Sequence, residues 1–460
     1  MTTLSKEHLS APITNRQQLV DYLAAGERPP SEWGIGLETE KLVVDRHSGE
    51  AATYPRIAAF MKRLEALGGW RGIYDNDHLV ALIGPDSSIT LEPGGQLELS
   101  GRLCPDMYCC CRDLKEHAEQ IAEAASPLDL AFLGLGVQPF TPLNKIDWLP
   151  KARYEIMGPY MQRCGSMGQR MMKQSAGVQV NLDFSSEEDC ITKMRLALSL
   201  VPVFYALFAN SPFLDGQASG LLSSRALIWE NTDRDRTGIL PFLFRDDAGY
   251  DTYIDYALDV PMYFLHRQQR YIDLTQSRFT FRRFLAEGVD GEVALLSDWD
   301  LHLSTLFPEV RLRPQIEIRS FDSLPACLAL APPALLKGLF YDESSCREAL
   351  ALFADQDDAE RHRLYGEAPR LGLETRWKDQ TLRDLALRLL ALAHAGLNRQ
   401  RLEDGGDEGR FLAPAEEIAL SGETLAQRLL KNWPQKREEQ VERLIKHCGY
   451  APLFSPSDCA

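Results

Sequence analysis

The sequence predicts an α+β protein with a mainly antiparallel sheet that helices cover. Up to about residue 325, short runs of alternating apolar and polar residues are interspersed with amphipathic helical segments and turns. Beyond that point, apolar residues recur with helical spacing almost throughout. No internal repeat or obvious linker divides the chain, so we expect one domain over residues 1–460, with a helical C-terminal portion from about residue 345.

The strand predictions rest on alternation and on turn residues. In residues 33–44, apolar and β-branched residues interleave with charged ones, and residues 177–183 alternate cleanly. The turn Pro93-Gly94-Gly95 separates two further short strands. The expected strands are 33–44, 89–92, 96–100, 131–137, 177–183 and 315–319.

The helix predictions rest on apolar spacing and on capping residues. Pro55 stands in the first turn of a segment in which Ile57, Phe60, Met61 and Leu64 share one face. Residues 215–245, rich in Gly, Asp, Asn and Arg, are expected to form a loop. Further helices are expected at 113–125, before residue 165, and at 186–209, 382–402, 416–433 and 437–447.

Composition and charge exclude several classes of protein. A formal net charge of −16 argues against a nucleic-acid or membrane-surface binder, since phosphate backbones and anionic lipids select basic patches. No apolar run is long enough to span a bilayer, and the first residues lack the basic-then-apolar pattern of a signal peptide. We therefore expect a cytoplasmic protein, monomeric or homodimeric, whose ten cysteines are reduced and mostly buried.

Four of the predicted strands carry polar side chains on one face. Successive side chains of a strand point to opposite faces, so residues two apart lie together. A solvent-facing sheet surface would explain this periodicity alone, but these faces carry Glu, Gln and Asn with hardly a lysine. The shared faces are Glu38 with Glu40, Gln96 with Glu98, Gln179 with Asn181 and Asp183, and Glu317 with Arg319.

Clustered carboxylates of this kind indicate a cation site. Carboxylates that face each other repel unless a cation joins them, and Mg²⁺ takes carboxylate oxygens together with substrate phosphates. A glycosidase is an alternative, but it needs only two carboxylates and leaves the other acids unexplained. The candidate magnesium ligands are Glu38, Glu40, Glu98 and Glu317, with Glu92 a weaker one.

A bound nucleotide would be held without a glycine-rich phosphate loop. The chain contains no GxxxxGK[ST] motif and no GxGxxG motif that opens a helix. Arginines must then balance the charge of the phosphates, and Arg225, Arg236 and Arg319 lie in or beside the polar segments. Taken singly, each of these arginines is more typical of a surface residue than of a ligand.

Several ordered segments of the sequence match the motifs of one known family. They are Gly36-Leu37-Glu38-Thr39-Glu40-Lys41, Leu91-Glu92-Pro93-Gly94-Gly95-Gln96-Leu97-Glu98-Leu99-Ser100-Gly101, Val178-Gln179-Val180-Asn181-Leu182-Asp183-Phe184, Leu207-Phe208-Ala209-Asn210-Ser211-Pro212-Phe213, Ile228-Trp229, Asp235-Arg236-Thr237-Gly238, Asp255-Tyr256-Ala257-Leu258-Asp259-Val260-Pro261-Met262-Tyr263 and Phe307-Pro308-Glu309-Val310-Arg311. In these motifs the chain resembles glutamate–cysteine ligase, the first enzyme of glutathione synthesis, in its plant-type branch that is also common in bacteria. The resemblance runs from about residue 33 to residue 345.

The resemblance implies a funnel-like, sheet-lined active site related to that of glutamine synthetase. The implied reaction is ATP-dependent: the glutamate side-chain carboxylate becomes a γ-glutamyl phosphate, which the cysteine amine attacks. Glu317 and Arg319 are then expected to be catalytic, with Mg²⁺ held by the five glutamates above. The residues expected to bind substrate or ATP are Gln179, Asn181, Arg225, Trp229 and Arg236.

Two segments depart from the plant-type pattern. Gln174-Ser175-Ala176-Gly177 replaces an Arg-Thr-Cys-Thr run, and Ser320-Phe321-Asp322-Ser323 replaces Gly-Ala-Asp-Gly. A related carboxylate–amine ligase that uses a different amine is therefore the alternative function, and an ATP-binding regulatory module without turnover is a further one. Plant members are controlled by disulfides, but we identify no partner position for Cys111 and expect no such switch.

Overall fold

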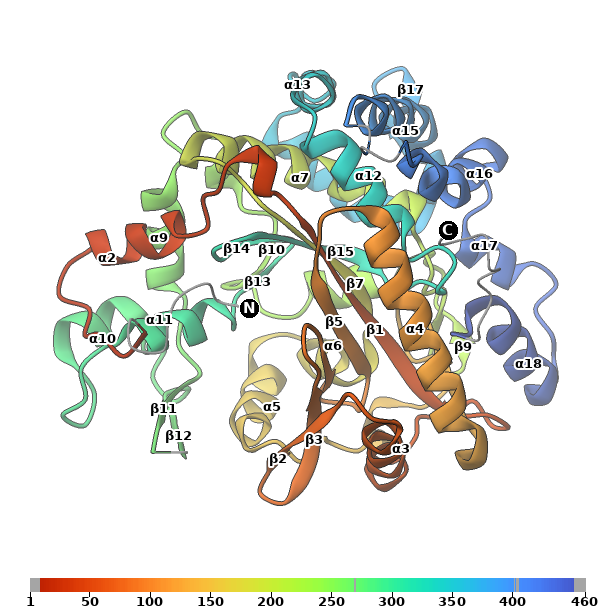
Figure 1. Cartoon of the computed structure of the whole chain (residues 1–460), viewed down its shortest axis with the longest axis horizontal. Helices are drawn as coiled ribbons and strands as arrows, with labels where there is room; N and C mark the ends of the chain where they lie inside the picture. Colours follow the sequence, from red (N-terminus) through yellow and green to blue (C-terminus); the bar gives the residue numbers. More distant parts are fainter. Residues whose placement is uncertain (1–8, 269, 401, 403–404, 451–460) are drawn as a thin grey trace.

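The computed structural model describes residues 9–268, 270–400, 402 and 405–450 (Figure 1). At its centre is a nine-stranded sheet in the order β14-β15-β7-β1-β5-β4-β3-β2, with β6 paired to β1. Every neighbouring pair in it is antiparallel, which confirms the predicted fold class. The strands are β1 (Ile35–Asp45), β2 (Arg71–Asp75), β3 (His78–Ile83), β4 (Ser88–Leu91), β5 (Leu97–Cys104), β6 (Leu130–Leu133), β7 (Gly177–Leu182), β14 (Val310–Leu312) and β15 (Ile316–Asp322).

Helices bury the apolar side of this sheet. Leu37, Leu97, Val180 and Ile318, which alternate with the polar residues of their strands, all belong to the main hydrophobic core. The packing helices are α3 (Tyr54–Leu67), α4 (Met107–Ala125), α7 (Glu187–Leu207) and α12 (Ala331–Phe340). The strand alternation seen in the sequence thus divides a covered face from a face that is free to form a site.

α7 is the core helix of the molecule. The side chain of Ser186 caps its start by accepting a hydrogen bond from the backbone N–H of Asp189 at 3.2 Å. The expectation that no apolar run is long enough to span a bilayer is wrong for this helix by length and composition, yet 89% of its most apolar stretch is buried inside the fold. Such burial is typical of the central helix of a globular protein.

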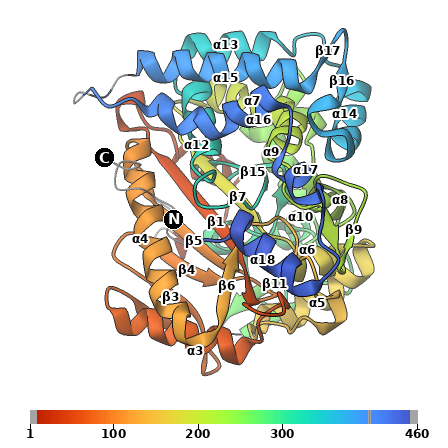
Figure 2. The same cartoon turned by 90° about the vertical axis from the view of Figure 1, so that its right-hand side faces the viewer.

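The C-terminal region is helical, as predicted, and lies on one side of the molecule (Figure 2). The predicted helix over 416–433 is wrong as one element: Gly422, with φ 72°, ends α16, and the side chain of Thr424 caps α17. α15 ends at Arg399, short of the predicted residue 402, and residue 401 lies outside the described residues. The helices are α13 (Glu343–Ala351), α14 (Asp358–Leu371), α15 (Leu382–Arg399), α16 (Ala413–Ser421), α17 (Leu425–Leu430) and α18 (Arg437–Cys448).

The segment predicted as a loop, residues 215–245, contains a helix, α8 (Ser224–Glu230). It has only seven residues, and Ser223 caps it through a hydrogen bond to the N–H of Ala226. A helix of two turns gives too few apolar repeats to stand out in a sequence. The remaining elements of three or more residues are α2 (Gln17–Ala24), α5 (Ala152–Cys164), α6 (Gly168–Gln174), α9 (Tyr250–Asp259), α10 (Phe281–Glu287), α11 (Leu296–Leu303), the hairpin β11 (Phe264–Arg267) and β12 (Arg270–Asp273), and six 3-10 turns.

The prediction of reduced cysteines is wrong for Cys104, Cys109 and Cys111, all of which are disulfide-bonded. A disulfide joins Cys104, at the end of β5, to Cys109, in the first turn of α4. The two residues are only five positions apart, and the strand-to-helix turn brings their Cα atoms to 5.6 Å. The bond therefore ties the end of a site strand to the helix that covers it.

Candidate active site

The strand order brings the four predicted polar faces side by side. β7 lies between β15 and β1, and β5 follows on the other side of β1. In the ladder Glu38 is opposite Gln179, Glu40 is opposite Glu98, and Glu317 is opposite Asn181. Residues from four separate parts of the sequence therefore form one continuous polar surface.

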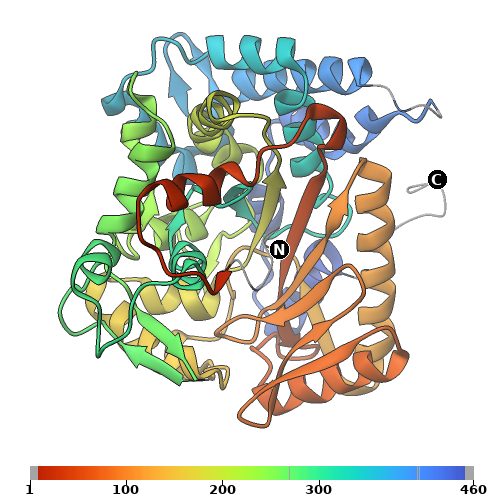
Figure 3. The same ribbon diagram turned by 60° about the vertical axis from the view of Figure 1, so that its left-hand side comes forward.

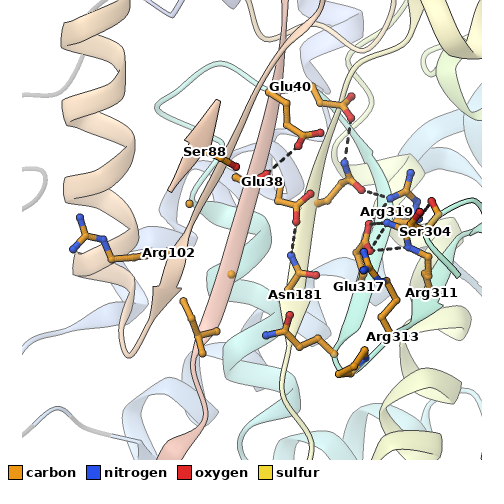
Figure 4. A pocket seen from close by; sticks show the side chains of 18 of the residues that line it. Glu38, Glu40, Ser88, Arg102, Asn181, Ser304, Arg311, Arg313, Glu317 and Arg319 are labelled. Atoms are coloured by element: carbon orange, nitrogen blue, oxygen red, sulfur yellow. Dashed lines mark hydrogen bonds and ion pairs between the residues drawn. The ribbon is translucent and has the colours of Figure 1, made fainter. Parts of the chain in front are cut away.

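This surface forms one wall of a cavity of about 570 Å³ (Figure 4). Its volume is in the range of small-molecule sites. Six acidic and six arginine side chains line it, so its formal charges are balanced. The acidic and the arginine side chains lie in different parts of the cavity. The charged lining residues are Glu38, Glu40, Asp86, Glu92, Glu98, Glu317, Arg28, Arg102, Arg153, Arg311, Arg313 and Arg319.

Strand β7 fixes the two glutamates of β1. Asn181 donates its side-chain amide N–H to Glu38 at 2.9 Å, and Gln179 donates to Glu40 at 3.1 Å. The backbone N–H of Gly177 donates to the other oxygen of Glu40 at 2.6 Å. Figure 4 shows Glu38 and Glu40 directed into the same space from one strand. The amides of Gln179 and Asn181 thus orient carboxylates.

Arginines hold the glutamate of β15. Arg311, on β14, donates two parallel hydrogen bonds to the carboxylate of Glu317, each 2.8 Å long. Arg319 also donates to Glu317 and to the side-chain oxygen of Gln179. Burial alone would raise the pKa of Glu317, but the two arginines outweigh it and lower that pKa to about 2. Glu317 is therefore a carboxylate that is already neutralised by protein cations.

The other four glutamates are less fully compensated. Among the described residues, none forms an ion pair with Glu38, Glu40, Glu92 or Glu98, and the charges of nearby arginines offset only part of the burial of Glu38 and Glu40. Burial and then the charge of Glu92 raise the pKa of Glu40 to about 7. Burial, followed by the neighbouring glutamates, raises the pKa of Glu98 well above its usual range, and burial with Glu317 raises that of Glu38. The protein alone leaves these acids in mutual repulsion.

This donor set fits a divalent cation. Four carboxylates, without a protein cation between them, face one water-accessible cavity, and hard oxygen donors are what Mg²⁺ prefers. A cation there would lower the raised pKa values by restoring charge balance. Glu92, at the turn after β4, lines the same cavity, as the sequence predicted for a weaker candidate.

A smaller chamber of about 100 Å³ adjoins the main cavity. Glu40, Glu92 and Arg319 line both spaces, whereas Trp229 lines only the smaller one. The indole N–H of Trp229 is buried without a hydrogen-bond partner among the described residues. The predicted ligand residue Trp229 is thus brought to the site. The other walls are mostly apolar or aromatic, with Tyr154, Met157, Met171, Met172, Phe264 and Phe307.

The other predicted arginines lie behind the site. Arg225 is buried and donates to the backbone oxygen of Arg319 at 2.9 Å, so it supports that strand and does not line either space. Arg236 is fully buried. Its guanidinium donates hydrogen bonds to the carboxylate of Asp233 at 2.7 Å and to the backbone oxygen of Pro261 at 2.8 Å. The structure does not bring Arg236 to the cavity.

The two segments that depart from the plant-type pattern border the site. Ser320 donates to Glu309 at 2.7 Å, and the carboxylate of Asp322 accepts hydrogen bonds from Ser211 and Ser223 at 2.8 and 2.9 Å. Ser175 lines the smaller chamber. These residues anchor β15 and the chamber floor by hydrogen bonds.

Sequence reasoning missed five arginines of the cavity, Arg28, Arg102, Arg153, Arg311 and Arg313. A signal for two of them was present, because Val310-Arg311-Leu312-Arg313 alternates apolar and basic residues and so places both arginines on one strand face. The run is only four residues long, which is why it did not stand out. Arg28 and Arg153 lie outside strands, and no periodicity marks them.

An antiparallel sheet with a cavity of carboxylates and arginines defines an ATP-dependent ligase of the carboxylate–amine class. The family model for Glutamate-cysteine ligase family 2 (GCS2) matches residues 34–447. The chain belongs to this family, and the resemblance found in the sequence is confirmed.

The relatives agree with this assignment. The chloroplastic glutamate–cysteine ligase of Medicago truncatula is 41% identical over 442 residues, 95% of this chain and 86% of its own length. Glutamate–cysteine ligase B of rice is 39% identical over 445 residues, covering 96% and 88%. A solved glutamate–cysteine ligase from Francisella tularensis, in complex with AMP, superposes with a TM-score of 0.53 at 13% identity over 90% of this chain and 88% of that one, which shows the fold.

The activity of the protein is glutamate–cysteine ligation, the first step of glutathione synthesis. The alternatives of a glycosidase and of a regulatory module are thereby set aside. Glutamate, cysteine and ATP are its substrates.

Proposed function

We propose that Glu38, Glu40, Glu92 and Glu98 hold Mg²⁺ in the main cavity, beside the phosphates of ATP. The observation that carries the proposal is that these four carboxylates face one cavity and form no ion pair with a cation of the described residues, while burial and the neighbouring carboxylates raise the pKa values of three of them. Mg²⁺ neutralises charge on phosphoryl oxygens when it is bound.

The residues of the chain then have distinct tasks in the reaction. Arg319 lies at the boundary between the two spaces and places a positive charge where the phosphoryl group would pass to the side-chain carboxylate of glutamate, giving the γ-glutamyl phosphate. Gln179 and Asn181 keep the β1 glutamates in position. Glu317 orients Arg311 and Arg319, and its predicted role as a further magnesium ligand stays a prediction.

The test measures metal binding and product formation separately. Mn²⁺, a spectroscopic substitute for Mg²⁺, is titrated into the wild type, Glu38→Gln and Glu40→Gln, and into Glu50→Gln as a control, because Glu50 is an exposed glutamate outside the cavity. We expect a loss of Mn²⁺ affinity of about 10-fold or more in the first two variants alone. Unchanged Mn²⁺ binding in both would contradict the proposal.

A coupled measurement addresses the reaction. ADP release with ATP, Mg²⁺, glutamate and cysteine is followed together with the mass of the product, and γ-glutamylcysteine is expected. Product formation by Glu38→Gln at the wild-type rate would remove that residue from the assignment. Cytoplasmic location and a monomeric or homodimeric state stay predictions, and light scattering of the purified protein tests the second.

A further inference from the structure

The segment that precedes β1, red in Figure 3, carries Arg28, which lines the main cavity. After α2, the backbone N–H of Arg28 donates to the carbonyl of Phe184 at 3.0 Å, and the indole of Trp33 donates to the carbonyl of Arg28 at 3.0 Å. Gly26 lies directly against the turn between β14 and β15, where a Cβ would come within 2.1 Å of the carbonyl oxygen of Pro314. The position of Arg28 is therefore fixed from both sides.

The side chain of Arg28 lines the main cavity. Its Nε lies 3.4 Å from Oδ1 of Asp183, a fully buried carboxylate that follows β7. That oxygen has no hydrogen-bond partner among the described residues, so the contact with Arg28 is electrostatic. Arg28 keeps a side-chain exposure of 19%, which leaves part of the guanidinium accessible.

Arg28 differs from the other arginines of the cavity in the hydrogen bonds that its guanidinium donates. The guanidinium of Arg311 is occupied by Glu317, and those of Arg102 and Arg313 donate to Asp113 and Asp300, each at 2.9 Å. In the described part of the chain, the guanidinium of Arg28 donates no hydrogen bond. Its N–H groups are therefore available to a ligand, as those of Arg311 are not.

We propose that Arg28 binds an anionic oxygen of a substrate, either a phosphate oxygen of ATP or the α-carboxylate of glutamate. A planar guanidinium binds phosphate and carboxylate oxygens through two parallel hydrogen bonds. The acidic part of the cavity repels both ligands unless cations hold them. Arg28 supplies such a cation from the N-terminal segment, opposite the sheet residues that the sequence singled out.

The competing explanation is structural, because Arg28 also compensates the buried charge of Asp183. The two roles separate in a set of variants: Arg28→Ala, Arg28→Lys, Asp183→Asn and the double variant Arg28→Ala with Asp183→Asn. If the arginine only balances Asp183, removal of that charge restores the properties of Arg28→Ala. Arg46→Ala is the matched control, since Arg46 is exposed at the far end of β1.

The measurements are KM for ATP, KM for glutamate, the Kd of a nonhydrolysable ATP analogue with Mg²⁺, and the thermal midpoint. We expect Arg28→Ala to raise KM for one of the two substrates about 10-fold. A rise for ATP together with weaker analogue binding identifies the phosphate, and a rise for glutamate alone identifies the carboxylate. Arg28→Lys should lie between Arg28→Ala and the wild type, and Arg46→Ala should match the wild type.

Two results would overturn the inference. One is an unchanged KM for both substrates in Arg28→Ala. The other is a rise that disappears in the double variant, along with any loss of thermal midpoint. The inference rests on the ligase reaction but not on the magnesium ligands, so Arg28→Ala should retain wild-type Mn²⁺ affinity, which Glu38→Gln should not.

Discussion

Glu317 and Arg311 stand opposite each other on β15 and β14 and are joined by two hydrogen bonds of 2.8 Å. Both side chains are buried, and Arg311 also donates to the backbone oxygens of Ser304 and Leu306 at 3.0 and 2.9 Å. The pair therefore links the sheet to the loop after α11 and fixes the edge of the site.

Glu317→Gln should destabilise the fold as well as impair catalysis. The substitution removes the negative charge that pairs with the buried guanidinium of Arg311. This loss costs about 3 kcal/mol of unfolding free energy. Urea unfolding measures the loss. Replacement of both residues by Met should recover part of the stability without activity, because Arg311 is then no longer an unpaired charge, whereas Arg319 still loses its contact with Glu317. A double variant as unstable as Glu317→Gln would show that the pair is not the cause.

Glu98→Gln should have the opposite effect on stability in the absence of metal. Burial and the nearby Glu38, Glu92 and Glu40 raise the pKa of Glu98, so an ionised Glu98 works against folding at neutral pH. In EDTA the variant should gain on the order of 1 kcal/mol of unfolding free energy. With Mg²⁺ and substrates, kcat should fall about 100-fold, if Glu98 is a ligand. Equal losses of stability with and without EDTA would contradict the repulsion.

His302 should make the free energy of unfolding fall as the pH is lowered. Burial lowers its pKa to about 4, while Nε2 contacts the backbone oxygen of Ala257 at 2.7 Å. The unfolded chain, with a His pKa of about 6.5, binds the proton more readily, so stability falls as the pH drops from about 6.5 to about 4. His302→Gln keeps a donor but does not titrate. The fall in unfolding free energy over this range should therefore be about 3 kcal/mol smaller in the variant, measured by urea unfolding at several pH values; an identical fall would refute it.

Gly26→Ala should displace the backbone segment that carries Arg28. The added Cβ would meet the carbonyl oxygen of Pro314 at 2.1 Å, so one of the two backbone segments must move, at about 1–3 kcal/mol. The shift also displaces Arg28, and the substrate KM that Arg28 controls should rise. Gly366→Ala is the matched control: Gly366 lies in α14 with nothing within 4 Å of an added Cβ, and alanine there should be neutral or stabilising by up to about 1 kcal/mol. The prediction fails if both variants have wild-type stability.

Strand alternation predicted the parts of the site that lie on regular strands. Glu38, Glu40, Glu98 and Glu317 all line the cavity, because alternation alone decides which face a strand residue occupies. Alternation gives no information on which strands are neighbours in the sheet. It therefore could not show that Asn181 and Gln179 would bind the β1 glutamates. That pairing is set by tertiary contacts between β7 and β1.

The sequence predictions that are wrong concern residues whose surroundings are set by tertiary contacts and not by the local sequence pattern. Arg236 stands in a family motif, yet Asp233, Pro261 and Tyr160 surround its guanidinium inside the core. A charged residue in a polar segment is read from sequence as accessible, and only packing shows that an ion pair has buried it. The short helix α8 and the Cys104–Cys109 bond were missed for a similar reason, since a turn too short to show periodicity creates both.

The interleaved strand order has a consequence for synthesis of the chain on the ribosome. The site strands β1, β5, β7 and β15 pair as β15-β7-β1-β5, although residues 35–322 separate the first from the last. β1, the central site strand, cannot complete its pairing until β7 has emerged, and Arg311 and Arg319 arrive only with β14 and β15. Ligation thus begins only after more than two thirds of the chain has been translated, and catalytic activity is a direct readout of nearly complete folding.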